Sequence, residues 1–301
     1  MLMLMRKISK KKIKKFYKNS QISINLDKIE IYDFGKPGMS FSNIILTRSR
    51  LNMLRLKDCK VRDCKFTQSI IGDDSYLRHA RFENVDFTGT LFRNTNLEKA
   101  EFVNCNLNYV KFENCLLNCD SIIKNSLPEE SNLKLGILNQ LYKNEISNGN
   151  VEKSDEILYL IRETEKDYIH DILLAKNEYF AEKRKHNIHN YIFKYIKVLL
   201  DKHIWGYGLN VGKILKTMII IIIIFAVMYF QLTFVEIKEI LPRLKNSVFM
   251  SINAFVMGSL NVGEPEIKCC VVAQIAVLLE NCIGVLYLAL ITSAMYRRIA
   301  R

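Results

Sequence analysis

A five-residue period runs from Phe41 to Ile122, and it restricts the fold more than any other feature of the sequence. A period of five fits neither an α-helix, which repeats every 3.6 residues, nor a β-strand, which alternates every two. It indicates a solenoid in which each five-residue unit forms one side of a square coil. The large apolar residues that carry the period, with one inserted residue between Ile71 and Leu77, are Phe41, Leu46, Leu51, Leu56, Val61, Phe66, Ile71, Leu77, Phe82, Phe87, Phe92, Leu97, Phe102, Leu107, Phe112, Leu117 and Ile122.

A second series of smaller residues lies two positions before the large ones. It comprises Cys59, Cys64, Ser69, Ser75, Ala80, Val85, Thr90, Thr95, Ala100, Cys105, Val110 and Cys115. We expect both series to face the narrow axis of the coil while the other three residues of each unit face outward. The cysteines are then small core residues rather than a disulfide framework. A metal site formed by Cys105, Cys115 and Cys119 is not expected, because their spacing is not that of zinc ligands, and no cofactor is predicted.

The stretch ARFENVDFTGTLFRNTNLEKAEFVNCNLNYVKFENC resembles the pentapeptide-repeat family, whose units read A-(D/N)-L-x-x. The resemblance covers residues 39–124. It implies a right-handed quadrilateral β-helix of about four coils, which at about 4.8 Å per coil is a rod near 20 Å long. We expect the insertion at residues 72–76 to bulge out at a corner.

Residues 1–38 are interpreted as a basic N-terminal segment, with one or two strands within residues 20–38. Its first 20 residues contain eight lysines or arginines and no acid. Such a tail suits anionic lipid, and the alternative is a solvated tail. Some pentapeptide-repeat proteins are acidic DNA mimics, but the outward positions here are basic, so we expect membrane lipid and no nucleic acid as a partner. These outward residues are Arg48, Arg50, Arg55, Lys57, Lys60, Arg62, Lys65, Arg78 and Arg81.

Residues 131–204 are predicted to form a cytosolic helical hairpin that serves as a linker. One amphipathic helix covers residues 132–146, a turn follows at residues 148–150, and a long helix covers residues 151–185. His186 and His189 are read as part of a solvated basic helix end rather than as metal ligands. The segment 191–200 is amphipathic and suits a membrane surface.

Residues 205–301 are predicted to form an all-α membrane domain with two spans. The apolar runs 215–234 and 269–296 are long enough to cross a hydrocarbon core of about 30 Å. Trp205 and Tyr207 suit the membrane interface before the first span. Because basic residues flank the outer ends of both spans, we expect a multi-pass protein of the cell's inner (plasma) membrane, with the N-terminal domain and the C-terminus in the cytosol.

The segment between the two spans predicts a re-entrant pore helix and a filter. Pro242 suits a helix start, and residues 244–256 can form about three turns. The glycine-bearing sequence that follows can line a narrow axis with backbone carbonyls, which is the principle of a carbonyl filter. The expected filter residues are Met257, Gly258, Ser259, Leu260, Asn261, Val262 and Gly263.

The strings SVFMSINAFVMGSLNVGEPEI and VVAQIAVLLENCIGVLYLALITSAMYRRIA resemble the pore helix, filter and inner helix of the two-transmembrane, potassium-channel-like pore family. Glu280, Gly284 and the tripeptide 206–208 match the branch of that family that is fused to pentapeptide repeats. The resemblance implies a homotetramer around one axis. The family's filter string, T-x-G-Y-G followed by Asp, is absent. We therefore expect a non-selective pore, a differently selective one, or a wider pore with a hydrophobic gate.

Two inner-helix residues each allow two interpretations. The carboxyl group of Glu280 lies mid-span, where an unpartnered charge would cost about 3 kcal/mol. It either contributes to a ring of four carboxylates that attracts cations, or accepts a hydrogen bond from Ser247 or Ser251. Gly284 is either a bending point or a close-packing position.

The sequence therefore predicts a tetrameric cation-conducting channel that its cytosolic repeats gate or assemble. The alternative is a membrane-anchored pentapeptide-repeat scaffold that does not conduct. An enzyme is not expected, because no Ser/His/Asp set, phosphate loop or metal motif stands out, and no catalytic residue is assigned.

Overall fold

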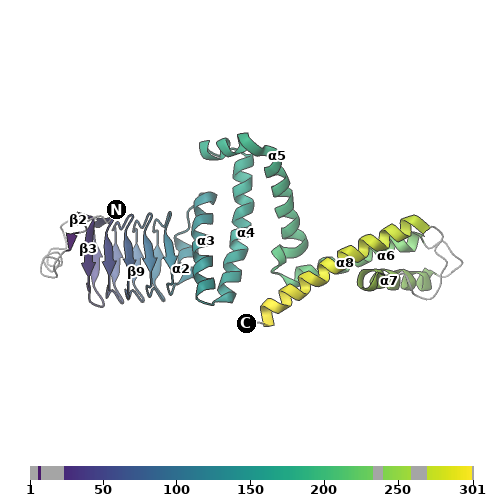
Figure 1. The fold of residues 1–301 in the computed structure, drawn as a ribbon, viewed down its shortest axis with the longest axis horizontal. Helices are drawn as coiled ribbons and strands as arrows, with labels where there is room; N and C mark the ends of the chain where they lie inside the picture. Colours follow the sequence, from purple (N-terminus) through teal and green to yellow (C-terminus); the bar gives the residue numbers. More distant parts are fainter. Residues whose placement is uncertain (1–5, 8–23, 233–239, 259–269, 300–301) are drawn as a thin grey trace. The chain divides into compact units, whose positions relative to one another are not determined.

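A computed structural model of the chain describes residues 6–7, 24–232, 240–258 and 270–299 (Figure 1). The chain divides into two compact units, Met1–Tyr191 and Ile192–Arg301. Helix α5 (Glu178–Leu200) crosses the division and has a non-helical residue at Asn187. Each unit is described by itself.

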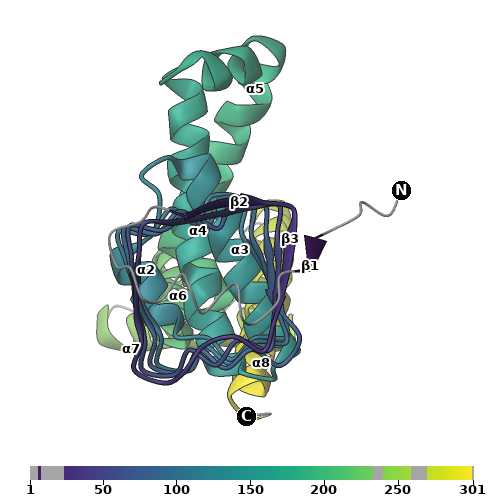
Figure 2. The ribbon, with the colours of Figure 1, turned by 90° about the vertical axis from the view of Figure 1, so that its left-hand side faces the viewer.

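The first unit begins with a parallel β-solenoid of about four turns, whose square outline is seen in Figure 2. Strands in successive turns pair in register, so that Ile31 lies opposite Leu51 and Phe92 opposite Phe112. The strands are β1 (Arg6–Lys7), β2 (Ile24–Asp27), β3 (Ile29–Tyr32), β4 (Ser40–Ser42), β5 (Ile44–Thr47), β6 (Arg50–Asn52), β7 (Lys60–Arg62), β8 (Ile70–Gly72), β9 (Arg81–Glu83), β10 (Leu91–Arg93), β11 (Glu101–Val103) and β12 (Lys111–Glu113).

The corners of the coil are made by left-handed residues. The second residue after a large core residue has a positive φ, as at Asn84 (55°), Asn94 (47°) and Asn104 (53°). Asn, Asp and Gly adopt this conformation most readily, which explains their recurrence at this position. The inserted residue is absorbed in the same way, because Asp73 and Asp74 both have positive φ. The bulge therefore lies at a corner, where the sequence predicts it.

The core of the solenoid contains the two residue series that the sequence predicts to face inward, except that the last large residue, Ile122, lies in helix α2 (Cys119–Asn125), where the coil predicted to reach residue 124 has already ended. Phe87, Phe92, Leu97 and Phe102 are completely buried, and so are the small residues Cys59, Ala80, Ala100 and Cys115. Aromatic rings of successive turns stack along the axis, with centroids 5.1 Å apart for Phe82 and Phe102 and 5.4 Å apart for Phe92 and Phe112.

The solenoid begins before residue 39, which is the start that the five-residue period predicts. Strand β2 pairs with β5, and β3 pairs with β6. Leu26 and Ile31 occupy the inward positions one turn before Leu46 and Leu51. The period is hard to recognise there because the next position of the series holds Lys36.

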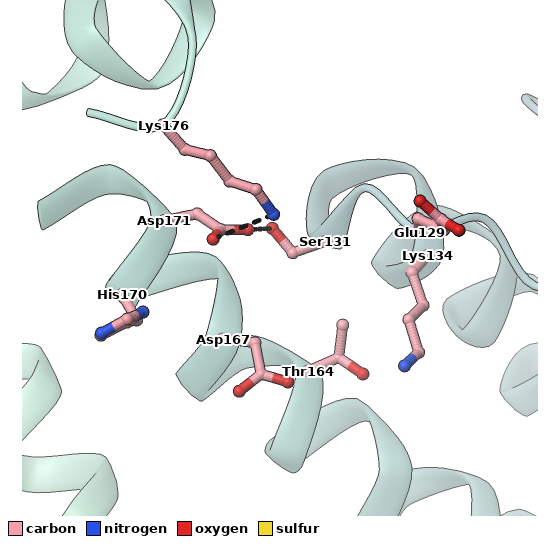
Figure 3. A pocket seen from close by; sticks show the side chains of 8 residues that line it. All are labelled: Glu129, Ser131, Lys134, Thr164, Asp167, His170, Asp171 and Lys176. Atoms are coloured by element: carbon pink, nitrogen blue, oxygen red, sulfur yellow. Dashed lines mark hydrogen bonds and ion pairs between the residues drawn. The ribbon is translucent and has the colours of Figure 1, made fainter. Parts of the chain in front are cut away.

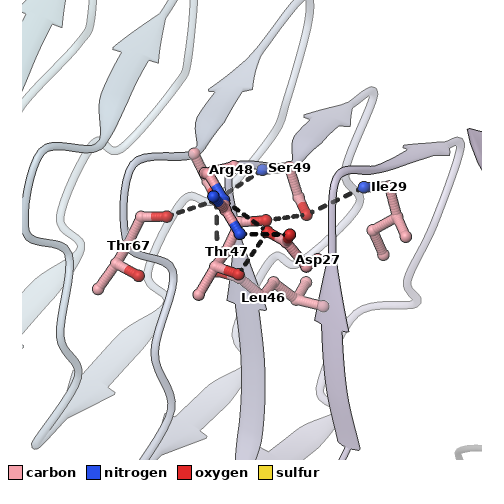
Figure 4. A network of polar contacts seen from close by, with 8 residues as sticks. Asp27, Ile29, Leu46, Thr47, Arg48, Ser49 and Thr67 are labelled. Atoms are coloured by element: carbon pink, nitrogen blue, oxygen red, sulfur yellow. Dashed lines mark hydrogen bonds and ion pairs between the residues drawn. The ribbon is translucent and has the colours of Figure 1, made fainter. Parts of the chain in front are cut away.

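Ion pairs between successive turns cover the outside of the solenoid. Asp27 accepts hydrogen bonds from Arg48 and from the Thr47 hydroxyl (Figure 4). The bond from Arg48 holds the pKa of Asp27 below its usual value. Arg93 Nε lies 2.8 Å from Glu113 Oε2. Several of the outward arginines are thus paired with acids one turn away.

Three helices follow the last turn of the solenoid: α2 (Cys119–Asn125), α3 (Ser131–Ser147) and α4 (Val151–Leu173). Asn144 of α3 closes the end of the coil. Its Oδ1 accepts a hydrogen bond from the backbone N–H of Cys115 at 2.9 Å, and its Nδ2 donates to the Cys115 carbonyl at 2.8 Å. The buried amide therefore replaces the strand that a further turn would supply.

The second unit contains the end of α5, a π-helical turn η1 (Asp201–Trp205), a 3₁₀ turn η2 (Gly206–Gly208), α6 (Val211–Leu232), α7 (Ile240–Met257) and α8 (Cys270–Ile299). Within the described residues, the segments Val211–Gln231 and Val272–Tyr296 are long and apolar enough to span a membrane. Their large side chains are often exposed, unlike those of a soluble core helix. The exposed ones include Ile219, Ile220, Ile223, Ile224, Leu278, Leu279, Val285 and Leu286.

Candidate functional site

The carboxyl group of Glu280 joins the three long helices of the second unit. Glu280 lies in α8 and is completely buried. Its Oε1 accepts a hydrogen bond from the Ser251 hydroxyl of α7 at 2.5 Å, and its Oε2 accepts one from the Tyr229 hydroxyl of α6 at 2.8 Å. Ser251 Oγ also lies 2.9 Å from the carbonyl oxygen of Ile222 in α6. The Glu280 side chain of α8 is thus hydrogen-bonded to both α6 and α7.

The sequence allows Glu280 either to join a ring of four carboxylates or to accept a hydrogen bond from a serine hydroxyl. Within the single chain, the structure contains the hydrogen bond from a serine of α7. Ser251 is the partner, whereas Ser247 bonds to the backbone carbonyl of Leu244 in its own helix. Sequence reasoning missed Tyr229. A phenol in a long apolar helix must find a hydrogen-bond partner when it is buried, and this requirement is the signal that the sequence offers.

Gly284 lies one helical turn after Glu280, where the backbones of α7 and α8 touch. A Cβ atom built on Gly284 would lie 2.0 Å from the carbonyl oxygen of Phe255. Helix α8 is continuous from Cys270 to Ile299. The structure therefore presents Gly284 as a close-packing position.

The two ends of α7 lie at different levels of the neighbouring helices. Near its start, Arg243 Nη2 donates a hydrogen bond to the Phe230 carbonyl at 2.6 Å, and its guanidinium lies over the Phe230 ring. At its other end, Gly258 has a φ of 66° and a Cβ there would lie 2.5 Å from Asn281 Nδ2. Helix α7 therefore begins beside the end of α6 and finishes beside the middle of α8 (Figure 1).

The expected filter residues are described only in part. Met257 is exposed at the last position of α7, and Gly258 packs against Asn281 as stated above. Ser259, Leu260, Asn261, Val262 and Gly263 lie outside the described residues.

Trp205 and Tyr207, the expected membrane-interface residues, form the corner that leads into α6. Gly206, Tyr207 and Gly208 all have left-handed φ values, of 56°, 61° and 69°. The left-handed φ of Gly206 favours glycine, and a Cβ there would also lie 3.0 Å from Asn210 Cβ. Trp205 packs with Ile214 and other apolar residues of α6 and α8.

A polar cavity of about 250 Å³ lies in the first unit, between the start of α3 and the end of α4 (Figure 3). The Ser131 hydroxyl donates to Asp171 Oδ2 at 2.6 Å, and Lys176 Nζ lies 3.4 Å from Asp171 Oδ1. These contacts fasten the first turn of α3 to the last turn of α4. Among the described residues, no group of three or more His, Cys, Asp or Glu side chains is placed to hold a metal ion.

A family model described as pentapeptide repeats (8 copies) matches residues 74–118. The match falls within the solenoid, between its inserted corner and α2. The solenoid is a pentapeptide-repeat domain. A search of curated proteins finds no match for the chain.

The cysteines of the pentapeptide-repeat domain behave as core residues. Burial raises the pKa of the Cys105 and Cys115 thiols to about 11. The Cys105 thiol lies 3.4 Å from the Phe82 carbonyl, and the Cys115 thiol lies 3.4 Å from that of Glu113. Such neutral thiols are poor metal ligands and poor nucleophiles.

Proposed function

We propose that this chain is one subunit of a homotetrameric membrane ion channel with a potassium-channel-like architecture. Helices α6, α7 and α8 supply one quarter of the pore, and the pentapeptide-repeat domain is the cytosolic part that assembles or gates it. The observation that carries the proposal is the course of α7 between the two candidate spans.

The course of α7 supports the proposal that it is a re-entrant helix. It starts beside the end of α6, at Arg243, and ends beside the middle of α8, at Gly258. With α6 and α8 as spans, the last carbonyl groups of α7 lie inside the membrane. Unsatisfied carbonyls at that depth are tolerated only where they are buried in protein or line water. The partial negative charge of the helix end favours a cation at the same place.

The Glu280 contact supports a pore rather than a simple anchor. A hairpin that only anchors a domain needs no third helix held between its spans by a buried carboxyl group. Here Glu280 bonds to both α6 and α7, and Gly284 allows α7 to touch α8. In the proposed channel, this contact fixes the helix that points at the ion pathway.

The outer face of α7 supports assembly of several copies. Val248, Ile252 and Val256 recur every four residues on one side of α7 and are exposed in the single chain. Neighbouring subunits around a common axis would cover this face. The number four comes from the family resemblance. Because the family's filter string is absent, the proposed pore conducts cations without potassium selectivity of the usual kind.

Recording from the purified full-length protein in planar bilayers tests the proposal. We expect discrete currents under a KCl gradient, and the reversal potential after Na⁺ replaces K⁺ gives the selectivity. Glu280→Gln should alter the open probability, whereas Cys282→Ala, at an exposed position of the same helix, should not. An intact tetramer that stays silent under all conditions would refute conduction and favour the membrane-anchored scaffold.

A further inference from the structure

The chain around the start of α6 is strongly basic. Between Ile192 and Lys216 it contains five lysines (Lys194, Lys197, Lys202, Lys213 and Lys216) and a single acid, Asp201. Clusters of four to eight basic residues next to a membrane span attract anionic lipid headgroups. Charge alone, however, does not distinguish lipid from other anions.

An exposed apolar face on the end of α5 indicates a lipid surface. Phe193 is 70% exposed, and Ile196 and Leu200 are about half exposed. They follow one another at intervals of three and four residues, so they share one face of the helix. Lys194 and Lys197 are exposed beside that face. An apolar face flanked by lysines is the pattern of a helix that lies in the plane of a membrane.

A packed corner holds this helix next to the first span. The hydroxyl of Thr217 in α6 lies 2.9 Å from the carbonyl oxygen of Ile204 in η1. The hydroxyl of Tyr287 in α8 donates to Thr217 Oγ1 at 3.1 Å. Trp205 packs in the same corner. The basic helix end is therefore fixed at the level where α6 begins, and Trp205 lies beside it.

We propose that residues 192–216 form a surface that selects anionic phospholipid headgroups in the leaflet where α6 begins. The apolar face of α5 enters the boundary between headgroups and acyl chains, and the lysines contact the phosphates. The proposal rests on the membrane placement in the proposed function but not on conduction. It adds a lipid class that the protein prefers.

Trp205 makes this surface directly measurable, because it is the only tryptophan of the chain. The full-length protein is placed in phosphatidylcholine bilayers that contain brominated phosphatidylglycerol or, in a matched sample, brominated phosphatidylcholine. Bromine quenches tryptophan fluorescence at short range. We expect the anionic lipid to quench Trp205 at a concentration at least fivefold lower than the neutral one.

Charge-neutralising variants test the assignment to these lysines. Lys194→Gln with Lys197→Gln should reduce the preference for the anionic lipid at least fivefold. Lys143→Gln, an exposed position in α3 of the first unit, should leave it unchanged. Salt at about 1 M should weaken the preference of the unmodified protein, because the screening length falls to about 3 Å. The salt experiment decides the matter even where the double variant does not fold.

Three results would overturn the proposal. Equal quenching by the two brominated lipids would exclude selection of anionic headgroups. Absence of quenching, with disulfide cross-links between chains that carry Phe193→Cys, would mean that a second copy covers the apolar face. Failure of the protein to insert into bilayers would overturn the membrane placement and hence the proposed function as well, whereas the first two results leave that function intact.

Discussion

Replacing Gly284 by alanine probes the contact on which the arrangement of α7 depends. The added Cβ would lie 2.0 Å from the Phe255 carbonyl oxygen, whereas carbon and oxygen atoms in contact are about 3.3–3.6 Å apart. The two helices must therefore separate by roughly 1.5 Å at this point. A separation of that size would stretch the 2.5 Å hydrogen bond between Ser251 and Glu280 beyond hydrogen-bonding distance.

The expected cost of Gly284→Ala is about 1–3 kcal/mol, the usual range for inserting an atom group into a filled site. Alanine gains up to about 1 kcal/mol in helix propensity, which offsets part of this cost. Gly136→Ala is the matched control. Gly136 is also in a helix, but a Cβ there meets nothing within 4 Å, so this change should be neutral or stabilising.

Thermal unfolding of the full-length protein measures both variants. Fluorescence of Trp205 follows the second unit, and circular dichroism follows total helix content. Gly284→Ala should lower the midpoint of the Trp205 transition by several degrees, since about 1 kcal/mol shifts a domain of ~100 residues by about 4–8 °C. Gly136→Ala should not lower either midpoint. A Trp205 transition that is unchanged or raised in Gly284→Ala would refute the close contact between α7 and α8.

Three further predictions concern polar groups in the two units. Tyr229→Phe removes one hydrogen bond from the buried Glu280 carboxyl group and should destabilise the second unit by about 1–3 kcal/mol, measured by the Trp205 transition; no change would mean that the contact with Glu280 contributes nothing. Asn144→Ala leaves the buried backbone N–H of Cys115 without its partner, while Asn148 still donates to the Cys115 carbonyl. The change should lower the free energy of unfolding of the solenoid by about 1–3 kcal/mol in denaturant titrations, whereas the exposed Asn139→Ala should have little effect. The thiols of Cys105 and Cys115 have a pKa raised from about 9 to about 11, so their contribution to stability is complete below pH 9 and is lost as the pH rises towards 11. The loss is up to about 1.4 kcal/mol per thiol and pH unit. Cys115→Ala should reduce this alkaline loss of stability, and an equal loss in that variant would exclude the thiol as its cause.

The sequence predicts the pentapeptide-repeat domain well because every turn places the same demand on the same position. An inward residue such as Phe92 must be large, and one such as Ala100 must be small, so the same pair of sizes recurs in the sequence every five residues. The first turn was harder to recognise because Lys36 interrupts the series. The two helices that are long and apolar enough to span a membrane are equally apparent, since the test depends only on length and composition.

The contacts of the second unit could not be read from the sequence in the same way. Tyr229 and Glu280 are 51 residues apart, and their meeting depends on how α6 and α8 are rotated about their axes. Gly284 is compatible with bending and with close packing until the position of Phe255 is known. Helix-to-helix register is therefore the information that the one-dimensional pattern lacks.

The square coil also makes the pentapeptide-repeat domain a device with a fixed angular step. Away from the inserted residue, each paired residue lies above the one that is 20 positions earlier, as Ile44 lies above Ile24. Duplication of a whole turn would lengthen the rod and leave α2 and α3 facing the same way. Duplication of one five-residue unit would preserve the core but rotate these helices by a quarter turn about the rod axis. The number of repeats thus sets both the length of the rod and the rotation of the helices that follow it about the rod axis. The corner at Asp73 and Asp74 shows how a single extra residue can be accommodated without changing that rotation.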